Sequence, residues 1–444
     1  MKTNWVPGIL AFLCLAGSLT AQTLLTAEDA MNIALRKNFS LSLAQYQTSE
    51  ATVNRQSAIG SFLPAVSASV VSEGSTSDST HAFSSTTVGT RPFTTVNANL
   101  NWQLFNGFQS YNAYQSLKST ETATELQERL TVEATLESVL SGYYNVVLQK
   151  QLLVAIRELL GVAEANAELA EAKTSVGAGS KLDELTAIAT LNSDSSSLLT
   201  QENALTQSKV QLNQLLARDP AMEFEVSDSI PLDSALPVEN WKALLEDNNA
   251  SILQAKAQQD AAASNLRQAK GMWLPSLSAG LGYTSVPSAL NSNSSLDGVY
   301  SHNGLNLSGT YNVTLSIPIF DQLQTHQAVS IARLQLRSGE TQFQSTLETI
   351  NTEFEQELQN YESGLQQVAL EERDLVVVQQ QADAAQEQYK VGTITALDLR
   401  TADQLLLSAK SQLFTAYQTT KQAEITLKGL AGFLVKTPEQ SASK

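Results

Sequence analysis

The sequence contains an internal duplication, which limits the possible fold more than any single motif does. Residues 38–68 (NFSLSLAQYQTSEATVNRQSAIGSFLPAVSA) align without a gap with residues 249–279 (NASILQAKAQQDAAASNLRQAKGMWLPSLSA). Leu-Phe-Asn at 104–106 corresponds to Ile-Phe-Asp at 319–321, and each half later has Val-Gly followed by Leu-Asp. A repeat of this kind indicates one structural unit used twice. We expect halves at 22–217 and 238–432, a linker with three prolines at 218–237, and a tail at 433–444.

Two long windows, residues 106–219 and 319–437, lack proline and are rich in Ala, Leu, Glu and Gln. This composition predicts long helices at 107–175 and 321–390, each followed by a Gly turn and a returning helix at 180–217 or 395–432. At about 1.5 Å per residue, each long helix reaches roughly 100 Å. An ordinary globular domain rarely contains helices of this length.

Strict alternation of apolar and polar residues predicts strands at 94–105 and 305–319, preceded in each half by a strand at 65–72 or 276–284. A half-buried strand of a soluble sandwich would also alternate. The segments at 94–105 and 305–319, however, contain no charged residue, and at 12 and 15 residues they are long enough to cross a bilayer in a barrel. Four strands cannot close a barrel around a channel, so several copies must share one. The Ser- and Asn-rich segments at 73–92 and 285–304 are then extracellular loops.

The N-terminus predicts a secretory signal peptide at 1–21, because Lys2 precedes an apolar run at 9–16. Cys14, the only cysteine, lies in that run. A net charge of −17 argues against nucleic acid as a partner. The three histidines are scattered, without metal-ligand spacing. We therefore expect that the chain is not an enzyme and binds neither a metal nor a cofactor.

Aromatic residues lie at the four predicted helix–strand junctions. Packing between helix and strand could explain any one of them, but an aromatic belt at a membrane interface explains all of them. The predicted interface residues are Phe62, Phe105, Trp273 and Phe320.

The turns between the paired helices carry a local signature. Gly177 and Gly392 suit the position after a helix C-terminus. Ser180 and Thr395 suit the N-cap of the next helix, with Asp183 and Asp398 three residues further on as an acidic capping box.

Taken together, the signal peptide, the two helix–strand–strand–helix repeats, Leu-Pro before the strands and Val-Gly between the helices resemble the TolC family of outer-membrane efflux proteins. The resemblance implies a mainly α fold with a transmembrane β-barrel. Each protomer of a homotrimer would give four strands to a shared twelve-stranded barrel, continuous with an α-helical tunnel in the periplasm. It implies a passive channel in outer-membrane lipid, working with a periplasmic adaptor and an inner-membrane pump.

The resemblance also implies roles for the two turns. Adaptor hairpins would dock at Val176, Gly177, Gly179, Val391, Gly392 and Thr393. Acidic side chains would surround the periplasmic mouth, with Asp398, Asp183 and Asp403 as candidates. Ile394 and Thr401 depart from the family pattern, which has a basic residue and a second acid there, so a tight charge lock is not expected. A periplasmic coiled-coil stalk or an adaptor-like protein, with a soluble β head, is the alternative.

Overall fold

The computed structural model describes residues 24–77, 89–233, 236–292 and 300–434. The predicted signal peptide, most of the predicted tail and the tips of both predicted loops lie outside the described residues. In chain order the elements are α1 Ala27–Lys37, α2 Phe39–Ser57, the 3-10 helix η1 Ala58–Phe62, β1 Ala65–Ser77, β2 Gly89–Asn106, α3 Gln109–Ser175, α4 Lys181–Leu215, α5 Val238–Asn248, α6 Ala250–Gly271, β3 Ser276–Ser292, β4 Tyr300–Ser316, α7 Gln324–Val391 and α8 Ala396–Leu430.

The chain divides into two compact units. The first, here called the helical unit, comprises Met1–Phe39, Ala134–Leu236 and Gln356–Gly429. The second, the sheet unit, comprises Ser40–Glu133, Pro237–Glu355 and Leu430–Lys444. The prediction of a mainly helical chain with one four-stranded sheet is confirmed.

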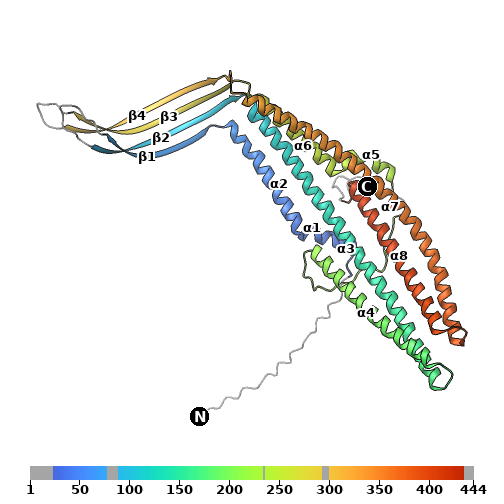
Figure 1. Cartoon of the computed structure of the whole chain (residues 1–444). Coiled ribbons are helices and arrows are strands. Elements are labelled where there is room, and N and C mark those ends of the chain that lie inside the picture. The colour runs from blue at the N-terminus through green and yellow to red at the C-terminus, as the bar shows by residue number, and fades with distance from the viewer. Residues whose placement is uncertain (1–23, 78–88, 234–235, 293–299, 435–444) are drawn as a thin grey trace, which may run out of the picture. The chain divides into compact units, whose positions relative to one another are not determined.

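The sheet is antiparallel throughout, with the strands in the order β1-β2-β3-β4 (Figure 1). Its register aligns residues of like polarity across the strands. Leu100 pairs with Val66 on one side and Leu281 on the other, and Leu281 pairs in turn with Tyr311. One residue along, the row consists of Ser67, Asn99, Gly282 and Thr310. Because side chains alternate between faces, one face of the sheet is apolar and the other polar.

The strands extend further into the Ser- and Asn-rich segments than predicted. β2 begins at Gly89 instead of 94, β3 runs to Ser292 instead of 284, and β4 begins at Tyr300 instead of 305. The loop predictions at 73–92 and 285–304 are therefore wrong at both ends of each segment, where the residues belong to strands. Glu73 pairs with Phe93, and Ser288 pairs with Gly304. Backbone pairing continues there without an apolar face to mark it. β4 ends at Ser316 instead of 319, just before Pro318, which has no N–H to donate.

The corner between strand and long helix has the same construction in both halves. Two successive residues have positive φ, Gly107 (66°) and Phe108 (64°) after β2, and Gln322 (58°) and Leu323 (67°) after β4. The residue before each pair binds the new helix. Asn106 Oδ1 accepts a hydrogen bond from Ser110 N (3.3 Å), and Asp321 Oδ2 accepts one from Thr325 N (2.8 Å).

The helical unit contains two helical hairpins, the C-terminal part of α3 with α4 and the C-terminal part of α7 with α8 (Figure 1). Its core includes fully buried Tyr143, Phe224, Leu212 and Leu427. The returning helices end at Leu215 and Leu430, against predicted ends at 217 and 432. At the first of these ends Ala217 turns to a φ of 48°, which stops α4.

Polar contacts fix the linker between the halves to the helical unit. Glu424 is only 1% exposed and accepts hydrogen bonds from the Nζ atoms of Lys421 (2.8 Å) and Lys428 (2.6 Å) and from the backbone N of Asp233 (3.3 Å). Lys150 Nζ lies 2.7 Å from the carboxylate of Asp228. A buried carboxylate is tolerated only with such partners, so the linker is part of the packed structure. No helix in the described ranges is both long enough and apolar enough to cross a membrane.

Candidate functional site

The two helix–helix turns of the helical unit have the same backbone geometry. Gly177 has a φ of +71° and Gly392 a φ of +81°, the left-handed region that favours glycine. After α3, Gly177 N donates to Thr174 O and Ala178 N to Lys173 O. After α7, Gly392 N donates to Tyr389 O and Thr393 N to Gln388 O. Each turn is thus a Schellman motif, which closes the C-terminus of its long helix.

Valine side chains project from both turns. Val176 is 78% exposed and Val391 is 75% exposed. Gly177 and Gly392 have no atom within 4 Å of the position where a Cβ would stand. The turns therefore present open backbone and one apolar side chain each.

The N-terminus of α8 is closed by Asp398. Its Oδ2 accepts hydrogen bonds from Thr395 N (3.0 Å) and Thr395 Oγ1 (2.8 Å), while Asp398 N donates to Thr395 Oγ1 (3.3 Å). The backbone bond, followed by the side-chain bond, lowers the pKa of Asp398 from its ordinary value. The predicted reciprocal capping box is present here.

The N-terminus of α4 is capped less completely. Ser180 Oγ accepts a hydrogen bond from Leu182 N at 3.1 Å, so Ser180 is the N-cap. Asp183 gives no reciprocal bond to Ser180 among the described contacts. Its charge acts instead on Tyr389, whose pKa is raised by burial and, to a smaller extent, by Asp183. Lys173 Nζ lies 4.9 Å from the centre of the same ring and donates to Tyr389 O at 3.2 Å.

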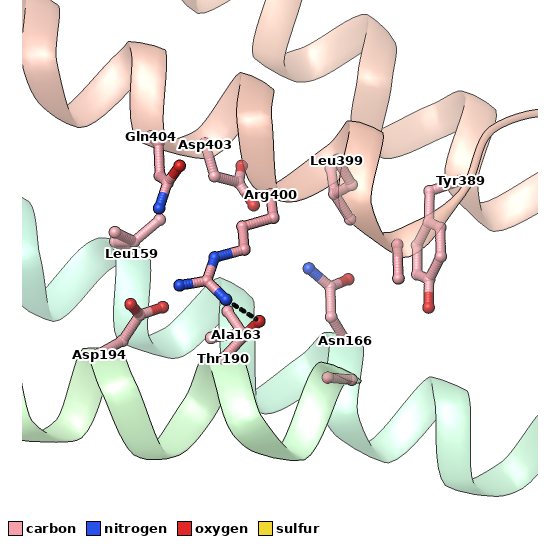
Figure 2. A pocket seen from close by; sticks show the side chains of 12 residues that line it. Leu159, Ala163, Asn166, Thr190, Asp194, Tyr389, Leu399, Arg400, Asp403 and Gln404 are labelled. Carbon is pink, nitrogen blue, oxygen red and sulfur yellow. Dashed lines mark hydrogen bonds between the residues drawn. The ribbon is translucent and has the colours of Figure 1, made fainter. Parts of the chain in front are cut away.

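Asp403, the third predicted acid, lies in a pocket between the two hairpins (Figure 2). Leu159 and Asn166 of α3, Thr190 and Asp194 of α4, Tyr389 of α7, and Leu399, Arg400 and Asp403 of α8 are among its lining residues. Arg400 Nη1 donates to Thr190 Oγ1 at 3.3 Å. Burial, with Asp194 as the smaller cause, raises the pKa of Asp403 to about 6.

The three predicted acids thus have three different environments. Asp398 is exposed and bound to its own helix end, Asp183 is half-buried near Tyr389, and Asp403 is half-buried beside Asp194. Sequence reasoning missed Asp194 and Tyr389. Their partners are distant in the chain, and no local spacing signals the contact.

The predicted interface aromatics all belong to the sheet unit and stand at its helix–strand junctions. Phe320 is 78% exposed, Trp273 51% and Phe62 43%, while Phe105 packs edge-on against Phe108. Trp102, which was not predicted in this role, is also exposed and donates its Nε1–H to Phe62 O at 3.0 Å. Within the described residues there is no group of three or more His, Cys, Asp or Glu side chains that could hold a metal.

The sequence is similar to known outer membrane proteins. The family model for "Outer membrane efflux protein" matches residues 30–218 and 242–433. Outer membrane protein TolC of Salmonella enteritidis is 27% identical over 193 residues, which are 43% of this chain and 38% of TolC. The outer membrane efflux protein BepC of Brucella suis is 24% identical over 346 residues, 76% of this chain and 72% of BepC.

Solved structures share the fold. The CusC structure has a TM-score of 0.77 at 20% identity, covering 96% of each chain. The Campylobacter jejuni CmeC outer membrane channel has a TM-score of 0.78 at 17% identity, covering 94% of this chain and 88% of CmeC. Because the family model matches most of both halves, the chain belongs to the TolC family of outer membrane efflux proteins.

Proposed function

We propose that this chain is the outer-membrane subunit of an efflux or secretion system and that three copies assemble into one passive channel. Each copy contributes its four strands to a shared barrel, which gives twelve strands in a trimer. The helical hairpins form the periplasmic tunnel. Energy and cargo selection come from a periplasmic adaptor and an inner-membrane transporter.

The observation that carries this proposal is the two-faced sheet with open edges. The apolar face is exposed, with Tyr311 at 86%, Val313 at 70% and Val66 at 75%. The outer edges of β1 and β4 have no strand beside them among the described residues. An open edge in lipid leaves N–H and C=O groups without hydrogen bonds, at a cost of several kcal/mol each. Pairing β1 of one copy with β4 of the next removes both edges.

The polar face suits the inside of a barrel. Most residues in the rows that cross it are Ser, Thr, Asn or Gly, as in Ser69, Asn97, Thr284 and Ser308. Thr284 Oγ1 donates to Asn97 Oδ1 across the strands at 3.0 Å. Hydroxyl and amide groups can exchange hydrogen bonds with water, whereas the opposite face cannot, which is the arrangement needed with lipid outside and water inside.

The turns are the proposed docking sites for the adaptor. An apolar side chain at each tip, Val176 and Val391, offers contact area, and the bare glycines beside them allow another backbone to approach closely. The adjacent acids, Asp398 and Asp183, are the proposed ring at the tunnel mouth. Threefold symmetry would place three copies of each around the axis, where they favour cations over anions. Asp403 is a weaker candidate for this ring, because it is half-buried between the hairpins.

The proposal is tested by reconstituting the purified, detergent-extracted protein into planar lipid bilayers. A steady ohmic conductance with preference for cations is expected, because the pore is passive and its mouth acidic. A folded protein that inserts into lipid but gives no conductance would contradict the channel. Protein that remains in the aqueous phase would favour the coiled-coil stalk.

A further inference from the structure

The pocket between the two hairpins has features that the channel proposal does not use. Two carboxyl groups, Asp194 of α4 and Asp403 of α8, line the same pocket although they come from different halves of the chain. Figure 2 shows them on facing helices, with the guanidinium of Arg400 extending from α8 toward α4. The pocket lies within the helical unit, alongside the N-terminal turns of α4 and α8.

The size of the pocket limits what it can bind. Its volume is about 30 Å³. One water in a protein cavity needs roughly 10–15 Å³ on this scale, so the pocket holds no more than a few waters. An organic ligand does not fit, and Arg400 opposes a metal cation beside the two acids. A proton is the ligand that remains.

In the part of the chain that the structure describes, neither carboxyl group has a direct hydrogen-bond or ion-pair partner, although the charge of Arg400 acts to lower the pKa of Asp194. Among the described residues, no hydrogen bond to Asp194 or Asp403 and no ion pair with either is present. Arg400, the nearest cation in the pocket, donates to Thr190 and lies beyond ion-pair distance of both acids. The neighbouring cation Lys410 is already paired with Glu158 at 2.5 Å.

The charged and titratable groups around the pair come from all four helices. Besides Asp194 of α4 and Asp403 of α8 themselves, they are Glu158 of α3, Asp183 of α4, Tyr389 of α7, and Arg400 and Lys410 of α8. With Glu158 and Lys410 neutralising one another, the two carboxylates outweigh the single guanidinium. Two like charges in a partly buried site favour uptake of one proton.

We propose that Asp194 and Asp403 form a proton-sharing carboxyl pair that makes the contact between helices α4 and α8 depend on pH. When one proton is bound, the carboxyl groups repel less and can share a hydrogen bond across the pocket. When the proton leaves, two carboxylates face one another, and the contact between the hairpins weakens.

The direction of the pH effect follows from the raised affinity for the proton. Burial raises the pKa of Asp194 more than the charge of Arg400 lowers it, and burial and Asp194 together raise the pKa of Asp403 to about 6. The ordinary pKa of an aspartate, about 3.9, describes the unfolded chain, and the folded-state pKa of Asp403 is higher. The proton therefore stabilises the contact fully at pH values below about 3.9. This stabilisation is lost as the pH rises through about 6. If the hairpins line a tunnel, mild acid tightens its wall near the mouth. That consequence rests on the proposed function, whereas the proton site does not.

Infrared titration of the full-length, detergent-extracted protein tests the proton site directly. The band of a protonated carboxyl group should disappear with a midpoint near pH 6, and Asp403→Asn should remove it. Asp194→Asn should move the midpoint to lower pH, because it removes a like charge. Asp374→Asn, at an exposed site on α7, is the matched control and should leave the midpoint unchanged.

A distance measurement tests the coupling to the helices. Spin labels at Ser193→Cys on α4 and Leu405→Cys on α8, in a chain whose native Cys14 is replaced, should report a longer distance above the midpoint. Labelled chains are diluted among unlabelled ones so that only pairs within one chain contribute. Asp403→Asn should hold the shorter distance at every pH.

The outcomes separate the two proposals. A carboxyl midpoint in the ordinary aspartate range, or a distance that ignores pH while the midpoint lies near 6, overturns the pH-dependent contact. Either result leaves the conductance test unaffected. Loss of conductance with an intact midpoint instead contradicts the channel and leaves the proton site standing.

Discussion

Asp398 combines two effects that substitutions can separate. Its carboxylate caps the helix α8 through Thr395, and it is also the leading candidate for the acidic ring. Thr395→Ala removes the hydroxyl of the capping box but leaves the carboxylate. Asp398→Asn removes the charge but leaves a side-chain oxygen that can still accept the hydrogen bonds from Thr395, the N-cap residue.

The first prediction is that these two variants give opposite patterns. Thr395→Ala should lower stability by about 1 kcal/mol, the usual cost of losing a cap hydroxyl, and leave the cation preference unchanged. Asp398→Asn should reduce the cation preference, measured as the reversal potential in a salt gradient across a planar bilayer. An unchanged reversal potential would mean that Asp398 does not face the ion path.

At the residue scale, local roles could be predicted from the sequence and distant contacts could not. The interval from Thr395 to Asp398 is fixed by the first turn of the helix, so the capping box was predictable. Ser180 and Asp183 have the same interval, yet no bond from Asp183 to Ser180 is present among the described contacts, and the charge of Asp183 acts on Tyr389. The pairing of Asp194 with Asp403 depends on how two hairpins pack, which no local pattern specifies.

The corners between strand and helix give the second prediction. Both corners need two left-handed residues, but only the first has a glycine, and a Cβ at Gly107 would lie 2.2 Å from Gly271 O. Gly107→Ala should therefore cost the strain of the left-handed conformation, roughly 1–2 kcal/mol, together with a backbone displacement. Gln322→Gly relieves the same strain at the second corner, and the stability of this variant should differ from that of the unsubstituted protein by less than about 1 kcal/mol.

Thermal unfolding of the detergent-extracted oligomer measures both corner variants under one condition. The expected order is a marked loss for Gly107→Ala and little change for Gln322→Gly. If Gln322→Gly lost as much stability as Gly107→Ala, the prediction would be contradicted, because removing the strained left-handed conformation at Gln322 would then bring no benefit.

The faces of β4 give the third prediction. Leu315 pairs with Leu277 on the apolar face, and its neighbour Thr314 pairs with Ser278 on the polar face. Leu315→Arg should cost about 2–4 kcal/mol if the side chain lies near the middle of the bilayer. Thr314→Arg, one residue away, should fold with a much smaller loss because its side chain faces water.

Folding into lipid vesicles at increasing denaturant measures the two strand variants. Normal folding of Leu315→Arg together with failure of Thr314→Arg would reverse the assignment of the faces. The register itself leaves no freedom here, since a shift by one residue exchanges all side chains between the faces.

At the element scale, the sequence predicts the faces of the strands better than their ends. Alternation identified residues 94–105 as a strand because apolar side chains need one common face. It could not show that β2 begins at Gly89, since the added residues continue the backbone pairing without an apolar pattern. The long helices were predicted to within a few residues because Pro, Gly and capping residues mark their ends.

At the scale of the whole molecule, the duplication explains why the chain has two hairpins of helices and two of strands. In the proposed trimer, the duplication would give six similar units around one axis. The two halves are not identical, however, and residues such as Gly107 and Gln322 differ at equivalent corners. The feature that calls for partner chains is the pair of sheet edges, at β1 and β4, that no other described strand covers.

The most direct test of the account is the native mass of the protein extracted from membranes in mild detergent, corrected for bound detergent. The account predicts three times the mass of the mature chain, with the four strands of each copy closed into one barrel. A monomer that is stable in water without detergent would contradict it, because the apolar face and both sheet edges would then be exposed to solvent.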